Sequence, residues 1–168
     1  FRSGTYTPIS PSRNCISSAM NVGHPSNLSR IVAMFGGVMN EKGEFRRVPD
    51  LKKMQDIMYA VRVSDDETRE TIRMCYTQTD TLLEPHGAVA WKGLEKFLGS
   101  EPGFPVDEKL CCILETAHPA KFMDEIRKFT DIPFEMPESL KRAIRADEEY
   151  VSLENEYNAF RDYIKKHY

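Results

Sequence analysis

The sequence lacks the features that mark several classes of protein. Lys and Arg number 23 against 26 Asp and Glu, so the net charge is −3 and no basic excess is present to neutralise nucleic-acid phosphates. No apolar run approaches the roughly 20 residues that span a bilayer. The first residues are mixed and polar, which is unlike a signal peptide. We therefore expect no nucleic-acid partner and no membrane partner.

Cysteine pairs with metal-binding or redox spacing are also missing. The four cysteines include no Cys-x-x-Cys pair, and together with the four histidines they show no zinc-ligand spacing, so we expect no metal. Their spacing suits buried, reduced thiols rather than a disulfide scaffold. A reducing compartment is the natural setting for such thiols, and the expected location is the cytoplasm.

The composition nevertheless provides enough apolar material for a packed core. Hydrophobic residues make up 40% of the 168 positions and aromatic residues 10%, which indicates one ordinary globular domain. The chain begins with Phe1 and enters turn-rich sequence at once. From this start we expect residues 1–168 to be a single fragment of a longer protein.

Apolar residues at helical spacing predict several helices. Ser64 and Glu67 have the spacing of a capping box, in which each side chain bonds the backbone N–H of the other residue. Residues 38–48 contain a turn between two short apolar segments, which predicts a hairpin or a surface excursion. The helices are expected over residues 25–36, from 64 to about 79, from Pro85 to Gly99, from Pro119 onward, and near the end of the chain, where Leu153, Tyr157, Phe160 and Ile164 mark a docking helix within residues 145–168.

Strands are predicted between these helices, at residues 57–63, 81–84 and 109–115. The apolar run at 109–115 is typical of a strand that is buried on both faces. Alternating strands and helices predict an α/β fold with a mainly parallel sheet flanked by helices. Ligands of such sheets bind beyond the carboxyl ends of the strands, and two of these ends carry polar turns, at 84–86 and 116–119.

Three segments resemble motifs of one enzyme family, the threonine synthases. They are residues 19–27 (AMNVGHPSN), 84–89 (EPHGAV) and 115–122 (ETAHPAKF), and they appear in the family's order with comparable gaps. The resemblance extends over essentially the whole chain. It implies the fold type II architecture of pyridoxal 5′-phosphate (PLP) enzymes, which is also that of the tryptophan synthase β subunit.

The resemblance also implies a reaction, the conversion of O-phospho-L-homoserine and water to L-threonine and phosphate by a PLP-dependent lyase. This chain matches only the C-terminal portion of such an enzyme. No Lys matches the family's Schiff-base lysine, and no Gly-rich stretch matches its phosphate-binding loop. We therefore expect no catalytic residue in this chain, an inactive isolated fragment, and the N-terminal remainder of the same enzyme as its partner.

The most specific role that the resemblance implies is that of Thr116. In the family, the hydroxyl of this Thr meets the pyridine nitrogen of PLP. A neutral hydroxyl makes the ring a weaker electron sink than an Asp would, which favours elimination and replacement along the substrate side chain. Thr is also a common helix N-cap, so Thr116 could instead cap the helix that starts at Pro119, and the two roles could coexist.

Glu84 is the second residue expected to bind the cofactor, by bonding its ring face or by ordering His86. The alternative is a strand-end carboxylate that bonds neighbouring amides. The other predicted pocket residues could also have purely structural roles. Residues 21–27 could be an ordinary capped helix start, His86 and His118 could be structural hydrogen-bonding residues, and Lys121 could face solvent or form an ion pair. The predicted substrate-pocket residues are Asn21, Gly23, His24, Pro25, Ser26, Asn27, His86, His118 and Lys121.

Two other functions are compatible with the same residues. The parent could be a threonine-synthase-like phospho-lyase or a dehydratase that does not deliver threonine. It could also be a non-catalytic binding module on the same scaffold, which the missing Schiff-base lysine would favour if no such lysine precedes this chain. Product analysis separates the first from a threonine synthase, and the upstream coding sequence separates the second.

Overall fold

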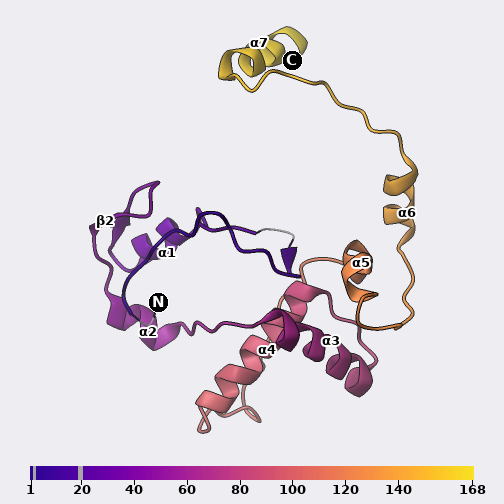
Figure 1. Cartoon of the computed structure of the whole chain (residues 1–168). Coiled ribbons are helices and arrows are strands. Elements are labelled where there is room, and N and C mark those ends of the chain that lie inside the picture. The colour runs from indigo at the N-terminus through magenta and orange to yellow at the C-terminus, as the bar shows by residue number, and fades with distance from the viewer. Residues whose placement is uncertain (2, 19–20) are drawn as a thin grey trace. The chain divides into compact units, whose positions relative to one another are not determined.

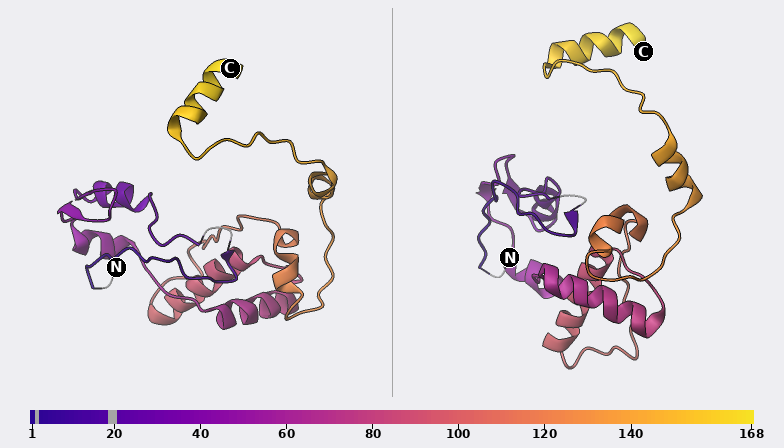
Figure 2. Two further views of the ribbon diagram at one scale, coloured as in Figure 1. Left: turned by 45° about the horizontal axis from the view of Figure 1, so that its top comes forward. Right: turned by 45° about the vertical axis from the view of Figure 1, so that its right-hand side comes forward.

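The computed structural model describes residues 1, 3–18 and 21–168 (Figure 1). The chain divides into two compact units, Phe1–Phe134 and Glu135–Tyr168. The first contains a helix-and-hairpin region and a pair of packed helices, and the second contains two separate helices (Figure 2). None of the helices in these described ranges combines the length and the apolar composition that a membrane crossing requires.

Helix α1 (Leu28–Met34) has Phe35 as its C-cap, and two glycines follow. Gly36 has a φ of 77°, and the next N–H, that of Gly37, donates to the carbonyl of Val32 at 2.9 Å. Glycine adopts this left-handed conformation without the steric cost of a Cβ. The predicted helix over 25–36 is therefore confirmed but shorter, because residues 25–27 form a turn before it.

A hairpin follows, made of β1 (Val38–Met39) and β2 (Phe45–Arg47), which pair antiparallel. The Asn40 side chain organises its turn by accepting from the N–H groups of Lys42 and Glu44, at 3.0 and 2.9 Å. This confirms the hairpin expected within 38–48.

Helix α2 (Leu51–Ile57) was not expected from the sequence. Asp50 caps it by accepting from the N–H of Lys53 at 3.0 Å, a common signal that the apolar run beginning at Ile57 obscured. The helix therefore takes in the first residue of the predicted strand at 57–63.

The mainly parallel sheet is not confirmed. Within the described residues the only sheet is the two-stranded hairpin, and residues 58–63, 81–84 and 109–115 form no strand. A strand exists only where a neighbouring strand pairs with its N–H and C=O groups, and residues 1, 3–18 and 21–168 provide no such neighbour for these segments. The apolar patterns at 81–84 and 109–115 are real, but the pairing that would turn them into strands is not found here.

Two long helices, α3 (Asp65–Thr79) and α4 (Pro85–Ser100), pack against each other and form the core of the first unit. The capping box that starts α3 is present as predicted, with Ser64 and Glu67 bonding each other's backbone. A fully buried aliphatic side chain contributes about 1.5–3 kcal/mol to stability, so this small core is the main anchor of the unit. The buried core residues are Ile72, Cys75, Leu83 and Ala88, with Leu82, Trp91 and Phe129 packed against them.

An ion pair joins the same two helices at the solvent boundary. The ammonium of Lys96 in α4 lies 2.6 Å from a carboxylate oxygen of Glu67 in α3. Hydrogen bonds from Lys96 and then from Ser64 lower the pKa of Glu67 from its ordinary 4.5 to about 2. The charged form of Glu67 thus serves both the cap and the helix pair.

A short 3₁₀ turn, η2 (Pro119–Phe122), and helix α5 (Met123–Ile126) close the first unit, which confirms a helical segment starting at Pro119. Ile126 is fully buried. Arg73 of α3 donates to the carbonyl of Phe129 at 3.1 Å, and its guanidinium lies 5.2 Å from that residue's ring centre. These contacts hold the 115–129 stretch against α3.

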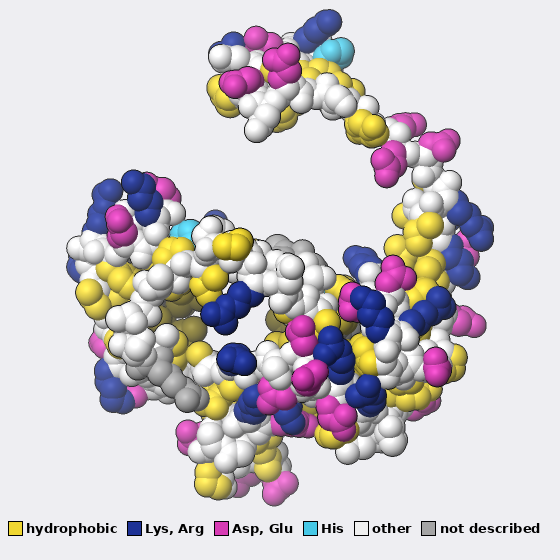
Figure 3. Space-filling view, viewed as in Figure 1, with side chains coloured by type: hydrophobic (Ala, Val, Ile, Leu, Met, Phe, Trp, Pro, Cys, Tyr) yellow, Lys and Arg dark blue, Asp and Glu magenta, His cyan; other side chains and the backbone are white. Residues whose placement is uncertain are grey.

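The second unit contains α6 (Glu138–Arg145), which was not predicted, and α7 (Tyr157–His167). The predicted docking helix within 145–168 therefore begins at Tyr157, and Leu153 precedes it. Apolar side chains are exposed in this unit and appear as yellow patches in Figure 3. That the helix α7 docks through its apolar side chains remains a prediction.

The lowered pKa of Glu67 has a testable consequence for stability. A carboxyl group whose pKa is lower in the folded state stabilises the fold fully above its unfolded pKa, and this contribution disappears as the pH falls toward the folded value. We expect Glu67→Gln to lower the free energy of unfolding at pH 7, and the difference from the wild type to shrink between pH 4.5 and about 2. Urea unfolding across this range measures it, with the exposed Glu108→Gln as control; a difference that does not vary with pH would contradict the assignment.

Candidate functional site

The site is built where two turns, each leading into a helix, come together. One turn carries Glu84 immediately before α4, and the other carries Glu115 and Thr116 shortly before η2. Glu84 has extended backbone (φ −81°, ψ 164°), and Pro85 occupies the first helical position, where its missing N–H costs nothing. The local sequence therefore places a carboxylate at the N-terminus of α4.

Glu84 is completely buried, and its carboxylate is hydrogen-bonded on every side. One oxygen accepts from the N–H of Gly87 at 3.0 Å and from the hydroxyl of Thr116 at 3.4 Å. The other accepts from the N–H of His86 at 2.8 Å and faces the Nδ1 of the same residue at 2.5 Å. Three donors and the His86 imidazole thus surround the two oxygens of this carboxylate.

Glu115 attaches the second turn to the first. One of its oxygens accepts from the backbone N–H of Glu84 at 2.7 Å, and its carboxylate packs so closely on Gly87 that a Cβ at that position would collide with it. Partial burial raises the pKa of Glu115, and the neighbouring charge of Glu84 raises it further, while the bond from the Glu84 N–H and the charge of His86 oppose the shift. We call Glu84, His86, Glu115 and Thr116 the Glu84 cluster.

The remaining residues of the 115–122 motif surround this cluster. Thr116 is exposed, and it does not cap η2: His118 does so, accepting from the N–H of Ala120 through Nδ1 at 3.1 Å. Phe122 packs on His86 with ring centres 5.2 Å apart. Lys121 is exposed on η2. The capping role considered for Thr116 is thus taken by a neighbouring residue.

The 21–27 segment has its own set of local contacts. His24 bonds the hydroxyl of Tyr6 through Nδ1 at 2.5 Å and donates from Nε2 to the carbonyl of Glu41 at 3.0 Å. Gly23 accepts from the N–H of Ile9 at 2.9 Å, and a Cβ there would collide with the carbonyl of Ile9. These contacts connect the segment to residues 6–9 near the N-terminus and to the turn of the hairpin.

Other residues of the same segment have similar surroundings. Asn21 accepts from the thiol of Cys15 at 3.3 Å, the Ser26 carbonyl accepts from the hydroxyl of Ser29, Asn27 is the N-cap of α1 without a side-chain bond, and Pro25 lies in the preceding turn. The first two residues of the motif, Ala19 and Met20, lie outside the described residues. Within the described ranges, no hydrogen bond or ion pair joins this segment to the Glu84 cluster.

The structure therefore brings together one part of the predicted site and leaves another part separate. Glu84, His86 and Thr116 meet, as expected from the two polar turns at 84–86 and 116–119. Glu84 bonds its neighbouring amides and also orders His86, and both of these roles had been considered for it. Sequence analysis missed Glu115 and Gly87 as site residues. Their signal was present in the motifs themselves, as a carboxylate next to Thr116 and a glycine three residues after Glu84.

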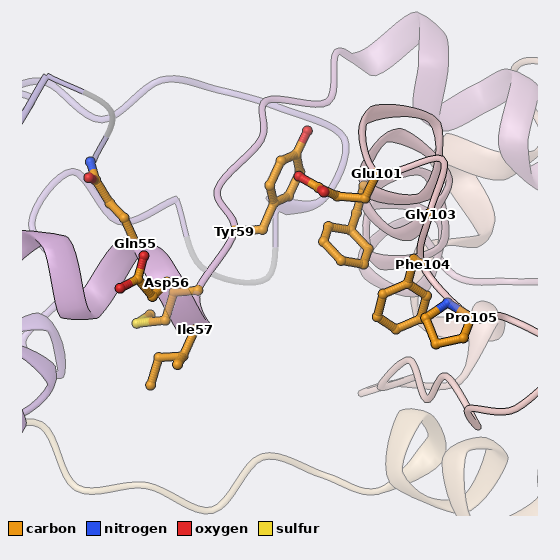
Figure 4. A pocket seen from close by; sticks show the side chains of 10 residues that line it. Gln55, Asp56, Ile57, Tyr59, Glu101, Gly103, Phe104 and Pro105 are labelled. Carbon is orange, nitrogen blue, oxygen red and sulfur yellow. The ribbon is translucent and has the colours of Figure 1, made fainter.

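A pocket lies in another part of the first unit, between the end of α2 and the end of α4 (Figure 4). Its volume is about 750 Å³, and the rings of Tyr59, Phe97 and Phe104 line it in edge-to-face contacts, with centres 5.3 and 5.1 Å apart. None of the residues that line it belongs to the Glu84 cluster.

Comparisons with known proteins agree with the motifs. A family model described as "Threonine synthase, C-terminal" matches residues 88–164. The threonine synthase of Haemophilus influenzae is 29% identical over 167 residues, covering 99% of this chain and 34% of that protein. A Xenopus laevis protein named threonine synthase-like 2 is 32% identical over 146 residues, covering 78% of this chain and 30% of that protein. The chain thus spans about a third of the length of these relatives.

A solved structure shows the same fold. The crystal structure of PLP-bound threonine synthase from Brucella melitensis matches with a TM-score of 0.69 and 23% identity, covering 99% of this chain and 37% of that one. These findings confirm the resemblance to the C-terminal portion of threonine synthases. They also support the fold type II class, without the detail of a parallel sheet.

The close approach of Glu115 to Gly87 can be tested by substitution. We expect Gly87→Ala to lower the free energy of unfolding by about 1–3 kcal/mol, because the new methyl group would displace the carboxylate. Gly99 lies in the same helix with open space around it, so Gly99→Ala should instead raise stability by about 0.5–1 kcal/mol through helix propensity. Chemical denaturation of both variants measures the contrast, and equal effects would refute the packing argument.

Proposed function

We propose that this chain, similar to the C-terminal portion of threonine synthases, completes the active site of a PLP-dependent lyase that converts O-phospho-L-homoserine and water to L-threonine and phosphate. The observation that supports this most is the hydrogen bond from the hydroxyl of Thr116, an exposed residue, to the buried carboxylate of Glu84. These two residues come from separate motifs of the family and meet at one point of the fold. The remainder of the enzyme would provide the Schiff-base lysine and the phosphate-binding loop.

The Glu84 cluster has donors and acceptors suited to the pyridine ring of PLP. Thr116 is an exposed residue whose neutral hydroxyl has one proton, which it donates to Glu84 here and could donate instead to a ring nitrogen, whereas Glu84 itself is buried. When bound, PLP supplies an electron sink for charge that develops on the substrate. In this arrangement Thr116 contacts the ring, and Glu84 holds the hydroxyl nearby until the hydroxyl turns its proton from the carboxylate to the ring nitrogen.

His86 is the residue of the cluster that is suited to handle a proton. Its Nδ1 is engaged by Glu84, its side chain is 26% exposed, and its ring is held against Phe122. The other ring nitrogen, Nε2, is then the atom that can hold or move a proton. His118 positions η2, and Lys121 together with the 21–27 segment remains our prediction for the substrate side of the pocket.

A second candidate function is a threonine-synthase-like phospho-lyase that acts on the same substrate and releases a different product. The similarity to the Xenopus laevis protein named threonine synthase-like 2 favours keeping it, since its identity to this chain is as high as that of the Haemophilus influenzae enzyme. Both functions use the same cluster and the same cofactor, and they differ in the fate of the substrate carbon skeleton.

Product analysis tests the proposal. The complete gene product that contains this chain, purified with PLP, should release phosphate from O-phospho-L-homoserine with an equal amount of L-threonine. Release of phosphate with 2-oxobutyrate in place of threonine would establish the second function. Absence of phosphate release under conditions where PLP is bound would reject both, and the same assay on an unphosphorylated homoserine sample serves as the control.

The role of Thr116 predicts a spectroscopic change. In the same gene product we expect Thr116→Asp to shift the absorbance of the bound cofactor and to reduce turnover tenfold or more, about 1.4 kcal/mol or more in activation free energy, because a carboxylate changes the protonation of the ring nitrogen. Thr116→Ser keeps the hydroxyl and should retain the wild-type spectrum. An unaltered spectrum in the Asp variant would remove Thr116 from the cofactor site.

A further inference from the structure

Glu115 has no assigned role in the function proposed above, yet it makes the closest contact between the two turns of the site. We propose that Glu115 is a positioning residue, which fixes the turn that carries Thr116 against the start of α4 and so holds the hydroxyl in place. This inference rests on the proposed contact between Thr116 and the cofactor ring. It concerns the length and acceptor capacity of the Glu115 side chain and does not require its charge.

The two turns are joined at two points. The N–H of Glu84 donates to Glu115 at 2.7 Å, and the hydroxyl of Thr116 donates to the Glu84 carboxylate at 3.4 Å. Both bonds link the same two turns. In the first the turn of Glu84 donates, through a backbone N–H, and in the second the turn of Thr116 donates, through a side-chain hydroxyl. The shorter bond is the stronger of the two, so Glu115 sets the distance at which Thr116 meets Glu84.

Regular secondary structure does not fix this turn within the chain. Residues 110–116 form neither helix nor strand here, so within the chain the bond from the Glu84 N–H to Glu115 links this turn to the start of α4. A reacting group that is misplaced by about 1 Å can cost a hundredfold in rate, so such a tie has functional weight.

Gly87 provides the space that this arrangement requires. The Glu115 carboxylate rests on the Cα of Gly87, where any side chain would collide with it. A shorter side chain at 115 would not reach the N–H of Glu84, and a larger residue at 87 would push the carboxylate away.

Two conservative substitutions separate length from charge. Glu115→Gln keeps the length and an oxygen that accepts from the Glu84 N–H, whereas Glu115→Asp keeps the charge but is one methylene too short. In the complete, PLP-loaded gene product we expect the Gln variant to retain the wild-type cofactor absorbance and kcat within about twofold. The Asp variant should show a shifted absorbance and a kcat roughly tenfold lower, with KM changed much less.

The opposite pattern would overturn the inference. A wild-type spectrum in the Asp variant, or equal disturbance in the Gln and Asp variants, would show that Glu115 does not act by its length. If the Asp variant does not fold, as judged by circular dichroism, Gly87→Ala displaces the same carboxylate from the other side and should cause the same absorbance shift, with Gly99→Ala as control. A wild-type spectrum in Gly87→Ala would then refute the proposal.

One further variant keeps this test distinct from that of the proposed function. Thr116→Ala removes the hydroxyl itself and should change the cofactor absorbance if Thr116 meets the ring. No change in that variant would reject the proposed role of Thr116, whatever Glu115 does. A change in Thr116→Ala together with a wild-type spectrum in Glu115→Asp would reject the positioning role alone.

Discussion

The buried carboxylate of Glu84 is the interaction on which the described site depends. A buried polar group is costly unless hydrogen bonds replace its water, and here three donors and the His86 imidazole surround the two oxygens. Two of these donors are backbone N–H groups at the start of α4, which would otherwise lack partners. The same carboxylate therefore caps a helix and holds the side chains of His86 and Thr116.

This arrangement makes the stability of the fold and the geometry of the site inseparable. Glu84 and Glu115 are 31 positions apart in sequence, and the helix pair α3 and α4 carries the first of them while the 115–129 stretch, packed on α3, carries the second. The small core around Ile72 keeps these parts together. A substitution in the Glu84 cluster will then affect both the free energy of unfolding and the position of Thr116. For this reason the absorbance of the bound cofactor separates a positioning role from a purely structural one better than the free energy of unfolding does.

The local elements of the fold could be predicted from the sequence wherever their signal was short-range. The capping box at Ser64, the proline starts of α4 and η2, and the glycine stop of α1 all depend on neighbouring residues, and each was confirmed. Helix α2 was missed because an apolar run at its end resembled a strand. The parallel sheet was not confirmed because strands need partners distant in sequence, and an apolar pattern alone does not show whether a partner is present.

The sequence by itself determined the family resemblance and the residue types of the site, since the motifs around Glu84 and Thr116 can be recognised without any structure. Only the tertiary structure decided which residues meet: it buried Glu84 completely, gave the cap of η2 to His118, tied His24 to Tyr6 and Glu41, and placed Glu115 on Gly87. The physical reason is that hydrogen bonds and steric fit depend on distances of a few tenths of an ångström between segments far apart in the chain. Sequence motifs specify the groups that take part, and the packing of the helices sets those distances.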